Sequence, residues 1–206
     1  MAARCPDDTS QLLARVAKGD SLATDQLLDR HRGRLVAMIK LRMDGRLTAR
    51  FDPSDVVQDS LTEAHGKLTN YARSQPIPFY PWLRGIAWQR LIQLQRQHLY
   101  AKRRSVSREE HSHQLADKSA ELLAERLPMP ATHASGHAIR KEIQARVHAA
   151  IQQLPEISRE IIILRHLEEM SFNEITDVLK MSEDAIYSRY RRAIEKLSRS
   201  LAKHDD

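Results

Sequence analysis

The residues best suited to chemistry lie near the C-terminus, where charged, hydroxyl and aromatic side chains recur at helical spacing. Between Lys180 and Lys203 the chain carries seven basic and three acidic residues. The apolar positions from Ile186 to Leu201 fall on one helix face and leave a polar face opposite. Arginine, hydroxyl and aromatic groups on such a face can bind base edges and phosphates in the DNA major groove. The candidates are Asp184, Tyr187, Ser188, Arg191 and Arg192.

A second basic segment lies in the first half of the chain. Between Arg84 and Arg104 there are six Lys or Arg and no Asp or Glu, a local charge that equals the formal net charge of +6. Aromatic and amide side chains accompany these cations, a combination that suits single-stranded nucleic acid. Trp82 lies on the apolar side and is expected in the core. The candidate contacts are Tyr80, Arg84, Trp88, Gln89, Arg90, Gln93 and Arg96.

An acidic segment precedes this basic one, because no Lys or Arg occurs between Asp52 and Glu63. Its charged side chains fall opposite an apolar stripe that runs from Val56 to Leu68. By itself this pattern indicates a solvated helix face. Its closeness in the chain to a basic segment also suits two surfaces that serve different partners. The candidate contacts for a basic partner are Asp55, Gln58, Asp59 and Glu63.

Helix signals place these residues on helices. Asp20 and Asp52 are expected N-caps, and Ser171 with Glu174 has the spacing of a capping box. Two helices are expected between Ser10 and Met43, one from Asp52 to Leu68 and one from Phe79 past Gln97. A loop is expected over residues 70–78 because Pro76 and Pro78 exclude a regular helix.

The C-terminal segment has the spacing of a helix-turn-helix: a short helix to Leu179, a turn at Lys180 and Met181, and a long basic helix capped by Ser182. Polar sequence with Pro128, Pro130 and Gly136 separates it from the N-terminal helices. The predicted fold class is therefore all-α, with two small helical domains joined by a polar linker. The domains are residues 1–104 and 138–206, and the linker is residues 105–137.

Composition narrows the function classes. Six Gly and 5% aromatic residues in 206 favour helices over sheets. Cys5 is the only cysteine, and the chain has no signal-peptide pattern and no apolar run of membrane-spanning length, so a cytoplasmic protein without membrane insertion is expected. Phosphate-binding and hydrolase motifs are absent, so no catalytic activity, cofactor or metal is expected. The histidines of the linker are expected in solvent: His111, His113, His133 and His137.

Several strings in family order resemble bacterial RNA polymerase sigma factors. LPEISREIIILRHLEEMSFNEITDVLKMSEDAIYSRYRRAIEKL resembles sigma region 4. DPSDVVQDSLTEAHGKL resembles region 2.2, and FYPWLRGIAWQRLIQLQRQ resembles regions 2.3 and 2.4. The helix pair around Gly19 is similar to region 2.1. No segment corresponds to the additional middle domain of housekeeping members, so the resemblance is to the extracytoplasmic-function (ECF, group IV) type.

The resemblance implies core RNA polymerase and promoter DNA as partners and raises the expectation of an anti-sigma factor. It implies that the acidic helix docks on the polymerase clamp helices and that the basic helix, with Gln89 at a base-reading position, lies on the melted −10 element. The C-terminal helix would read the −35 element. This sequence departs from the family pattern at Lys180, where glycine is common, and at Tyr187, where a basic residue is frequent. The loop over residues 70–78 lacks the usual glycine.

Two other classes remain open at this point. A stand-alone helix-turn-helix regulator would bind duplex operators without polymerase, but it gives no use to the acidic helix or to the tryptophan-containing basic helix. A purely structural helical protein leaves the segregation of charge unexplained.

Overall fold

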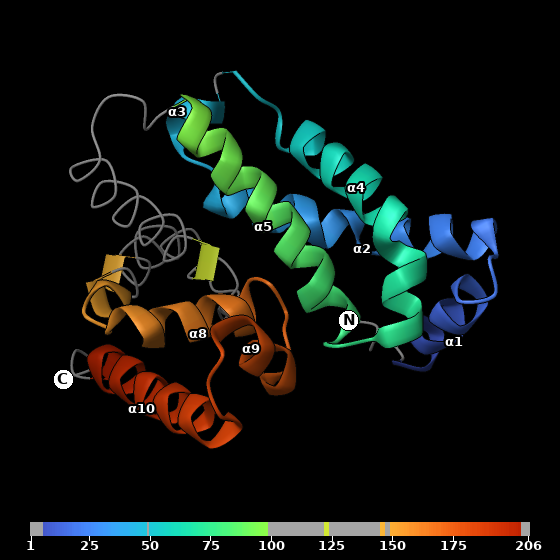
Figure 1. The fold of residues 1–206 in the computed structure, drawn as a ribbon. Coiled ribbons are helices and arrows are strands. Elements are labelled where there is room, and N and C mark those ends of the chain that lie inside the picture. The colour runs from blue at the N-terminus through green and yellow to red at the C-terminus, as the bar shows by residue number, and fades with distance from the viewer. Residues whose placement is uncertain (1–5, 49, 99–121, 124–144, 147–148, 203–206) are drawn as a thin grey trace, which may run out of the picture. The chain divides into compact units, whose positions relative to one another are not determined.

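The computed structural model describes residues 6–48, 50–98, 122–123, 145–146 and 149–202. Within these ranges all regular structure is helical, which confirms the all-α fold class (Figure 1). The chain forms two compact units, Met1–Lys102 and Arg103–Asp206. Each unit is described by itself, with the helix labels of Figure 1.

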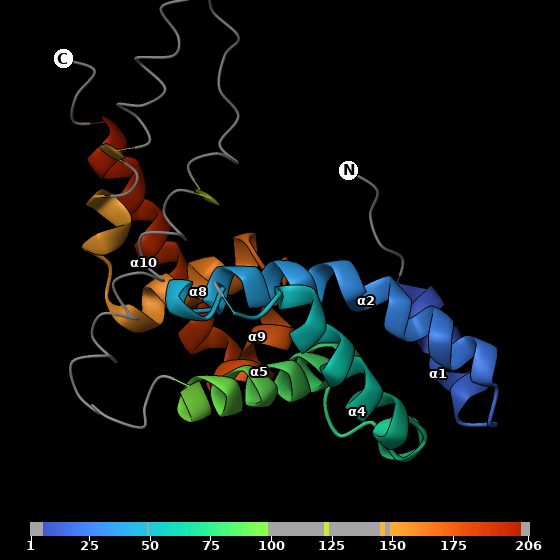
Figure 2. The ribbon, with the colours of Figure 1, turned by 90° about the horizontal axis from the view of Figure 1, so that it is seen from above.

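The first unit is a bundle of helices. Its members are α1 (Pro6–Val16), α2 (Ser21–Arg42), the short α3 (Gly45–Thr48), α4 (Pro53–Ser74) and α5 (Phe79–His98). The helices α2, α4 and α5 pack against one another in pairs, and α1 covers α2 and α4 (Figures 1 and 2). Apolar side chains of the three long helices are fully buried between them, among them Leu27, Leu35, Leu68, Leu83 and Leu91.

The predicted N-caps of this unit are confirmed. The Asp20 carboxylate accepts a hydrogen bond from the amide of Ala23 at 3.1 Å, and the Asp52 carboxylate accepts one from the amide of Ser54 at 2.7 Å. Pro53 occupies the first position of α4, where its missing N–H is not needed. The hydrogen bonds that these carboxylates accept lower the pKa of both aspartates. Local sequence therefore fixes where α2 and α4 begin.

The prediction of a loop from Asn70 was wrong, because α4 continues to Ser74. Tyr71 and Ala72 are buried and extend the apolar stripe by another turn, and the nearest proline comes only at residue 76. The helix ends at Gln75, which adopts a left-handed conformation with φ 38°. The Tyr71 hydroxyl donates to the carbonyl of Ile77 at 2.7 Å, so the end of α4 also holds the short connection to α5.

The described helices of the second unit include α8 (Glu156–His166), α9 (Phe172–Leu179) and α10 (Glu183–Ala202). They pack against one another and bury Leu154, Ile162 and Ala193 in a shared core. The capping box is confirmed: the Ser171 hydroxyl accepts from the Glu174 amide, and the Glu174 carboxylate accepts from the Ser171 amide. Lys180 ends α9 with φ 54°, the conformation for which glycine is usual.

Most of the predicted linker lies outside the described residues, as do Cys5 and the four linker histidines. Leu122 and Leu123 are described and helical, and Leu123 packs against the core of the second unit. At least this part of the segment therefore belongs to the C-terminal unit. The first residues of the predicted C-terminal domain, 138–144, are likewise outside the described residues.

Candidate nucleic-acid interface and the adjoining acidic face

The acidic face of α4 carries the four residues predicted to meet a basic partner, and all four side chains are exposed. Three of them already contact another side chain. Gln58 accepts from Arg32 Nη2 at 2.9 Å, Asp59 accepts from Arg90 Nη2 at 2.6 Å, and Glu63 pairs with Lys67. Asp55 has no hydrogen-bond or ion-pair partner among the described residues. The Arg32 and Arg90 contacts come from other helices, so no sequence spacing signals them.

The exposed part of α5 presents Gln89, Gln93 and Arg96, three of the residues predicted for single-stranded DNA. Trp88 is half-buried. Two guanidinium groups lie over its ring, with Arg42 Cζ at 5.5 Å and Arg84 Cζ at 5.8 Å from the ring centroid. Arg42, from the end of α2, was missed at the sequence level because nothing in α2 marks it as a neighbour of Trp88. These cations fix the ring at the edge of an exposed polar surface.

Two of the predicted DNA contacts on α5 are buried. Tyr80 is 2% exposed and Arg84 is 5% exposed. The Tyr80 ring packs under Arg34, whose Cζ lies 3.4 Å from the centroid, and stacks near His31. Burial argues against direct base contact by either side chain. Tyr80 packs against α2, and Arg84 lies over the ring of Trp88 in α5. Residue type put them among the DNA candidates, and residue type alone does not distinguish a buried side chain from an exposed one.

Trp82, expected in the core, is half-buried and lies in an aromatic cluster. Its ring stacks on Tyr71 with centroids 4.4 Å apart and lies 5.7 Å from Phe79. Burial raises the pKa of Tyr71 to about 12, because the phenolate would lose its hydration. This cluster joins the end of α4 to the start of α5 and so fixes the angle at which α5 presents its exposed face.

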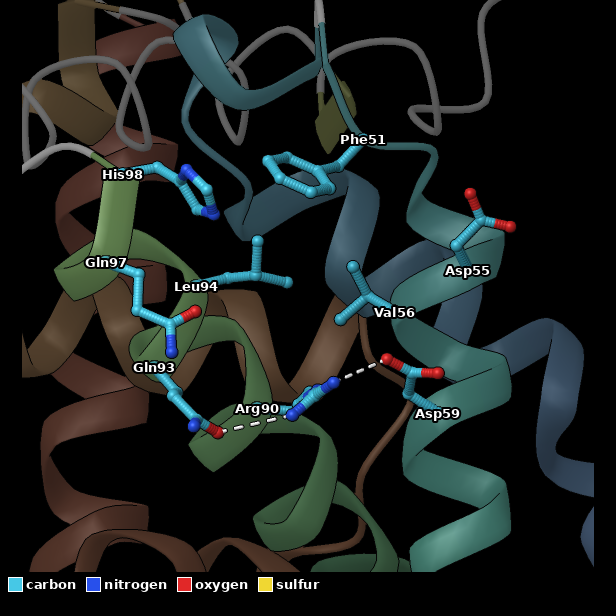
Figure 3. A pocket seen from close by; sticks show the side chains of 9 residues that line it. All are labelled: Phe51, Asp55, Val56, Asp59, Arg90, Gln93, Leu94, Gln97 and His98. Carbon is cyan, nitrogen blue, oxygen red and sulfur yellow. Dashed lines mark hydrogen bonds and ion pairs between the residues drawn. The ribbon is translucent and has the colours of Figure 1, made fainter.

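A pocket between α4 and α5 brings the acidic and basic faces together (Figure 3). Val56 and Leu94 supply apolar surface, and Asp59 and Arg90 form an ion pair across it. Arg90 Nη1 also donates to Gln93 Oε1 at 3.4 Å. The remaining residues that line the pocket are Phe51, Asp55, Gln97 and His98.

The polar face of α10 is exposed as predicted at Asp184, Tyr187, Arg191 and Arg192, whereas Ser188 is half-buried. Arg192 Nη2 donates to the Ser188 hydroxyl at 2.8 Å. Tyr187 is 55% exposed, and its ring meets Phe172 of α9 edge to face at 5.7 Å. The apolar face packs inward, with Ile186 and Ala193 buried.

One neighbour of this face was not predicted. His166, in the last turn of α8, hydrogen-bonds to the Tyr190 hydroxyl at 3.1 Å and stacks on its ring. Phe172 touches both tyrosines of α10, so α8 and α9 hold α10 through an aromatic cluster. Such a scaffold leaves the opposite face of α10 free for a ligand.

In the part of the chain that the structure describes, no group of histidine, cysteine or carboxylate side chains has an arrangement that could hold a metal ion. Over the same residues, no helix combines the length and apolarity needed to cross a bilayer.

Comparison with known proteins matches both halves of the chain. Residues 144–197 match the family model "Sigma-70, region 4". Over 195 residues, 95% of this chain and 94% of the relative, the sequence is 29% identical to the RNA polymerase sigma-H factor of Pseudomonas aeruginosa. It is 25% identical over 190 residues to the ECF RNA polymerase sigma-E factor of Haemophilus influenzae, covering 92% of this chain and 93% of the relative.

A solved structure of CnrH in complex with the cytosolic domain of CnrY is similar with a TM-score of 0.52 and 27% identity, covering 96% of this chain and 99% of that one. These likenesses extend through both units rather than the helix-turn-helix alone. The chain is therefore similar, through both units, to bacterial RNA polymerase sigma factors that include the extracytoplasmic-function type.

Proposed function

We propose that this protein binds core RNA polymerase and directs it to specific promoters, where it initiates transcription. The observation that carries the proposal is the likeness to sigma factors over 95% of the chain, which includes the acidic and basic helices of the first unit as well as the helix-turn-helix. A stand-alone regulator would need only the second unit.

The two units divide the task in this proposal. Residues 1–104 bind the polymerase clamp and open the −10 element, and residues 138–206 read the −35 element. The exposed carboxylates and amide of α4 support the first role because a clamp with basic residues needs complementary charge. The exposed face of α10, held from behind by Phe172 and His166, supports the second.

Opening of the −10 element is driven by binding in this scheme. Trp88, fixed by Arg42 and Arg84, offers ring surface for a base, and Gln89, Gln93 and Arg96 offer edge and phosphate contacts. Binding energy for extruded bases offsets unstacking, which costs a few kcal/mol per step. The factor needs no nucleotide hydrolysis, and we propose that it has no catalytic activity of its own.

A protein that masks the polymerase-binding surface is part of the proposal. CnrH is known in complex with the cytosolic domain of CnrY. A comparable partner, an anti-sigma factor, would hold this chain inactive until it is released. Because promoters and polymerase are cytoplasmic in bacteria, we propose that location for the protein.

Run-off transcription tests the proposal. Purified protein, bacterial core RNA polymerase and fragmented DNA from the source genome are combined, with core polymerase alone as the control. Discrete start sites that depend on the protein support a sigma factor. Binding of duplex operators by the protein alone, without core binding or initiation, would instead establish a stand-alone regulator.

A further inference from the structure

One ion pair connects the two proposed binding surfaces of the first unit. Arg90 Nη2 of α5 lies 2.6 Å from Asp59 Oδ2 of α4, across the pocket of Figure 3. The same guanidinium reaches Gln93 Oε1 at 3.4 Å. A carboxylate proposed to bind polymerase is therefore joined to two residues proposed to bind promoter DNA.

The pair engages the carboxylate that polymerase would bind and the guanidinium that promoter DNA would bind. Asp59 cannot give the same oxygen fully to a basic clamp residue while it accepts from Arg90. Arg90 cannot extend to a phosphate or a base while its guanidinium is turned toward α4. Nearby residues of the same type lack this constraint. Asp55, four residues earlier on α4, and Arg96, on α5, are exposed and have no hydrogen-bond or ion-pair partner among the described residues.

We propose that Arg90 is an internal competitor for Asp59 that couples polymerase binding to DNA binding; the inference rests on the proposed sigma-factor function. In the free protein Arg90 forms an ion pair with Asp59. A basic side chain of the polymerase clamp replaces it at this carboxylate, and the released guanidinium turns to the backbone of the opened promoter strand. Gln93, one turn along α5, accepts a hydrogen bond from the same guanidinium in the free protein.

The exposure of the pair makes exchange feasible. The side chains are 38% exposed at Arg90 and 56% at Asp59, so water and a partner can reach both. Partly exposed ion pairs are worth about 0.2–1 kcal/mol, equivalent to roughly a 1.4- to 5-fold change in an equilibrium constant. The coupling is reciprocal, so that DNA which engages Arg90 also frees Asp59 for polymerase.

The first test measures DNA binding by the free full-length protein, with fluorescein-labelled oligothymidylate at low ionic strength as the probe. Asp59→Asn releases Arg90 and is expected to bind the probe about 1.4- to 5-fold more tightly than Asp55→Asn, which removes the same charge from the same helix. In an Arg90→Gln background, Asp59→Asn and Asp55→Asn are expected to bind equally.

The second test measures affinity for core RNA polymerase. Arg90→Gln frees Asp59 and is expected to bind core polymerase more tightly than Arg96→Gln, which removes the same charge elsewhere on α5. In an Asp59→Asn background this advantage disappears. If Arg90 had only a structural role, its substitution would lower the affinity for core polymerase or leave it unchanged. An increase in affinity therefore identifies competition.

The results separate this inference from the function on which it rests. Failure of the wild-type protein to bind core polymerase or to initiate transcription would refute the sigma-factor function itself. If the wild type initiates, equal probe binding by Asp59→Asn and Asp55→Asn, or no measurable binding by any variant, overturns the competition. The competition is also overturned if Asp59→Asn still binds the probe more tightly than Asp55→Asn in the Arg90→Gln background.

Discussion

Lys180 ends α9 in a left-handed conformation, φ 54° and ψ 44°, in which a side chain with a Cβ is disfavoured by about 1–2 kcal/mol. Glycine removes this clash but loses more conformational entropy on folding, about 0.5–1 kcal/mol. Lys180→Gly is therefore expected to stabilise the C-terminal unit by about 0.5–1 kcal/mol, measured as the free energy of unfolding in urea. Lys180→Ala is the control, since it removes the same charge but keeps the Cβ. Equal stability of the two variants would show that the backbone conformation is not the cause.

Tyr71 is expected to link stability to alkaline pH. Burial raises its pKa from 10.0 to about 12 in the folded protein. The folded state thus keeps the phenol protonated where the unfolded chain ionises, so this contribution to stability is complete below pH 10 and falls as the pH approaches 12. Tyr71→Phe also loses the hydrogen bond to Ile77, at a cost of about 1 kcal/mol.

The measurement for Tyr71 is the difference in unfolding free energy between wild type and Tyr71→Phe as a function of pH. This difference cancels the titration of lysines and of the other tyrosines. It is expected to decrease above about pH 10. A difference that is independent of pH would mean that the Tyr71 phenol titrates alike in the folded and unfolded states.

Side-chain partners are the part of the candidate site that sequence reasoning reaches least. It identified the exposed Gln89, Gln93 and Arg96 because charge and periodicity are local properties of α5. It assigned Tyr80 to a DNA surface, whereas Arg34 and His31 of α2 cover that ring. Contacts between helices depend on their packing angles, which periodicity does not specify.

At the scale of elements, the N-terminus of α4 is expected to make stability depend on acidic pH. The Ser54 amide, donating to Asp52, lowers the pKa of that carboxyl below its ordinary value of 3.8. Because the folded pKa is below the unfolded one, the contribution to stability is complete above the unfolded value and is lost as the pH falls through the folded value. Asp52→Asn keeps an N-cap oxygen but does not titrate in this range.

Urea unfolding of wild type and Asp52→Asn between about pH 2 and pH 6 checks this expectation. The stability advantage of wild type is expected to be constant in the upper part of the range and to shrink in the lower part. Asp20→Asn provides an independent comparison at α2, where the Ala23 amide and Arg15 lower the pKa of Asp20 in the same way. A parallel pH dependence in wild type and variants would contradict the role of these caps.

Arg159 of α8 is expected to be the main polar support of the turn that precedes this helix. Its Nε donates to the carbonyl of Ile151, and its Nη2 donates to those of Gln152 and Leu154. Arg159→Met keeps much of the side-chain volume but removes all three hydrogen bonds, so a loss of about 1–3 kcal/mol in unfolding free energy is expected. Arg189→Met removes an exposed arginine of α10 and should cost far less. Similar losses of unfolding free energy in both variants would show that the hydrogen bonds of Arg159 do not stabilise this turn.

Helix starts were predictable and helix ends were less so. The caps Asp20, Asp52 and Ser171 each accept a hydrogen bond from an amide two or three residues later in the chain. Their capping roles can therefore be predicted from sequence. The end of α4 was placed too early, since the decisive factor is burial of Tyr71 and Ala72 by other parts of the first unit. Tertiary contacts of this kind override the local preference of a proline-containing segment.

At the scale of the whole molecule, the proposed function divides promoter recognition between two units that polymerase would hold together. Linkage through polymerase would raise the effective concentration of the second DNA contact once the first has formed. The free protein is therefore expected to bind promoter DNA poorly. Substitutions in different units are expected to act on the holoenzyme–promoter complex with additive free energies, because distant sites without shared partners are independent.

Arg192→Ala in α10 and Gln89→Ala in α5 test this division of labour in the holoenzyme. Each is expected to weaken promoter binding by about 1–3 kcal/mol, the range for a base contact, and the double variant by about the sum. If Arg192 contacts a phosphate, its loss also lowers the slope of log K against log salt by about 0.9, whereas loss of the neutral Gln89 leaves the slope unchanged. Affinities are measured by titrating holoenzyme into labelled promoter DNA at several salt concentrations. If Arg192→Ala weakened binding of the free protein to duplex DNA as much as it weakened binding of the holoenzyme, the C-terminal unit would act without polymerase, and the division between two units would have to be abandoned.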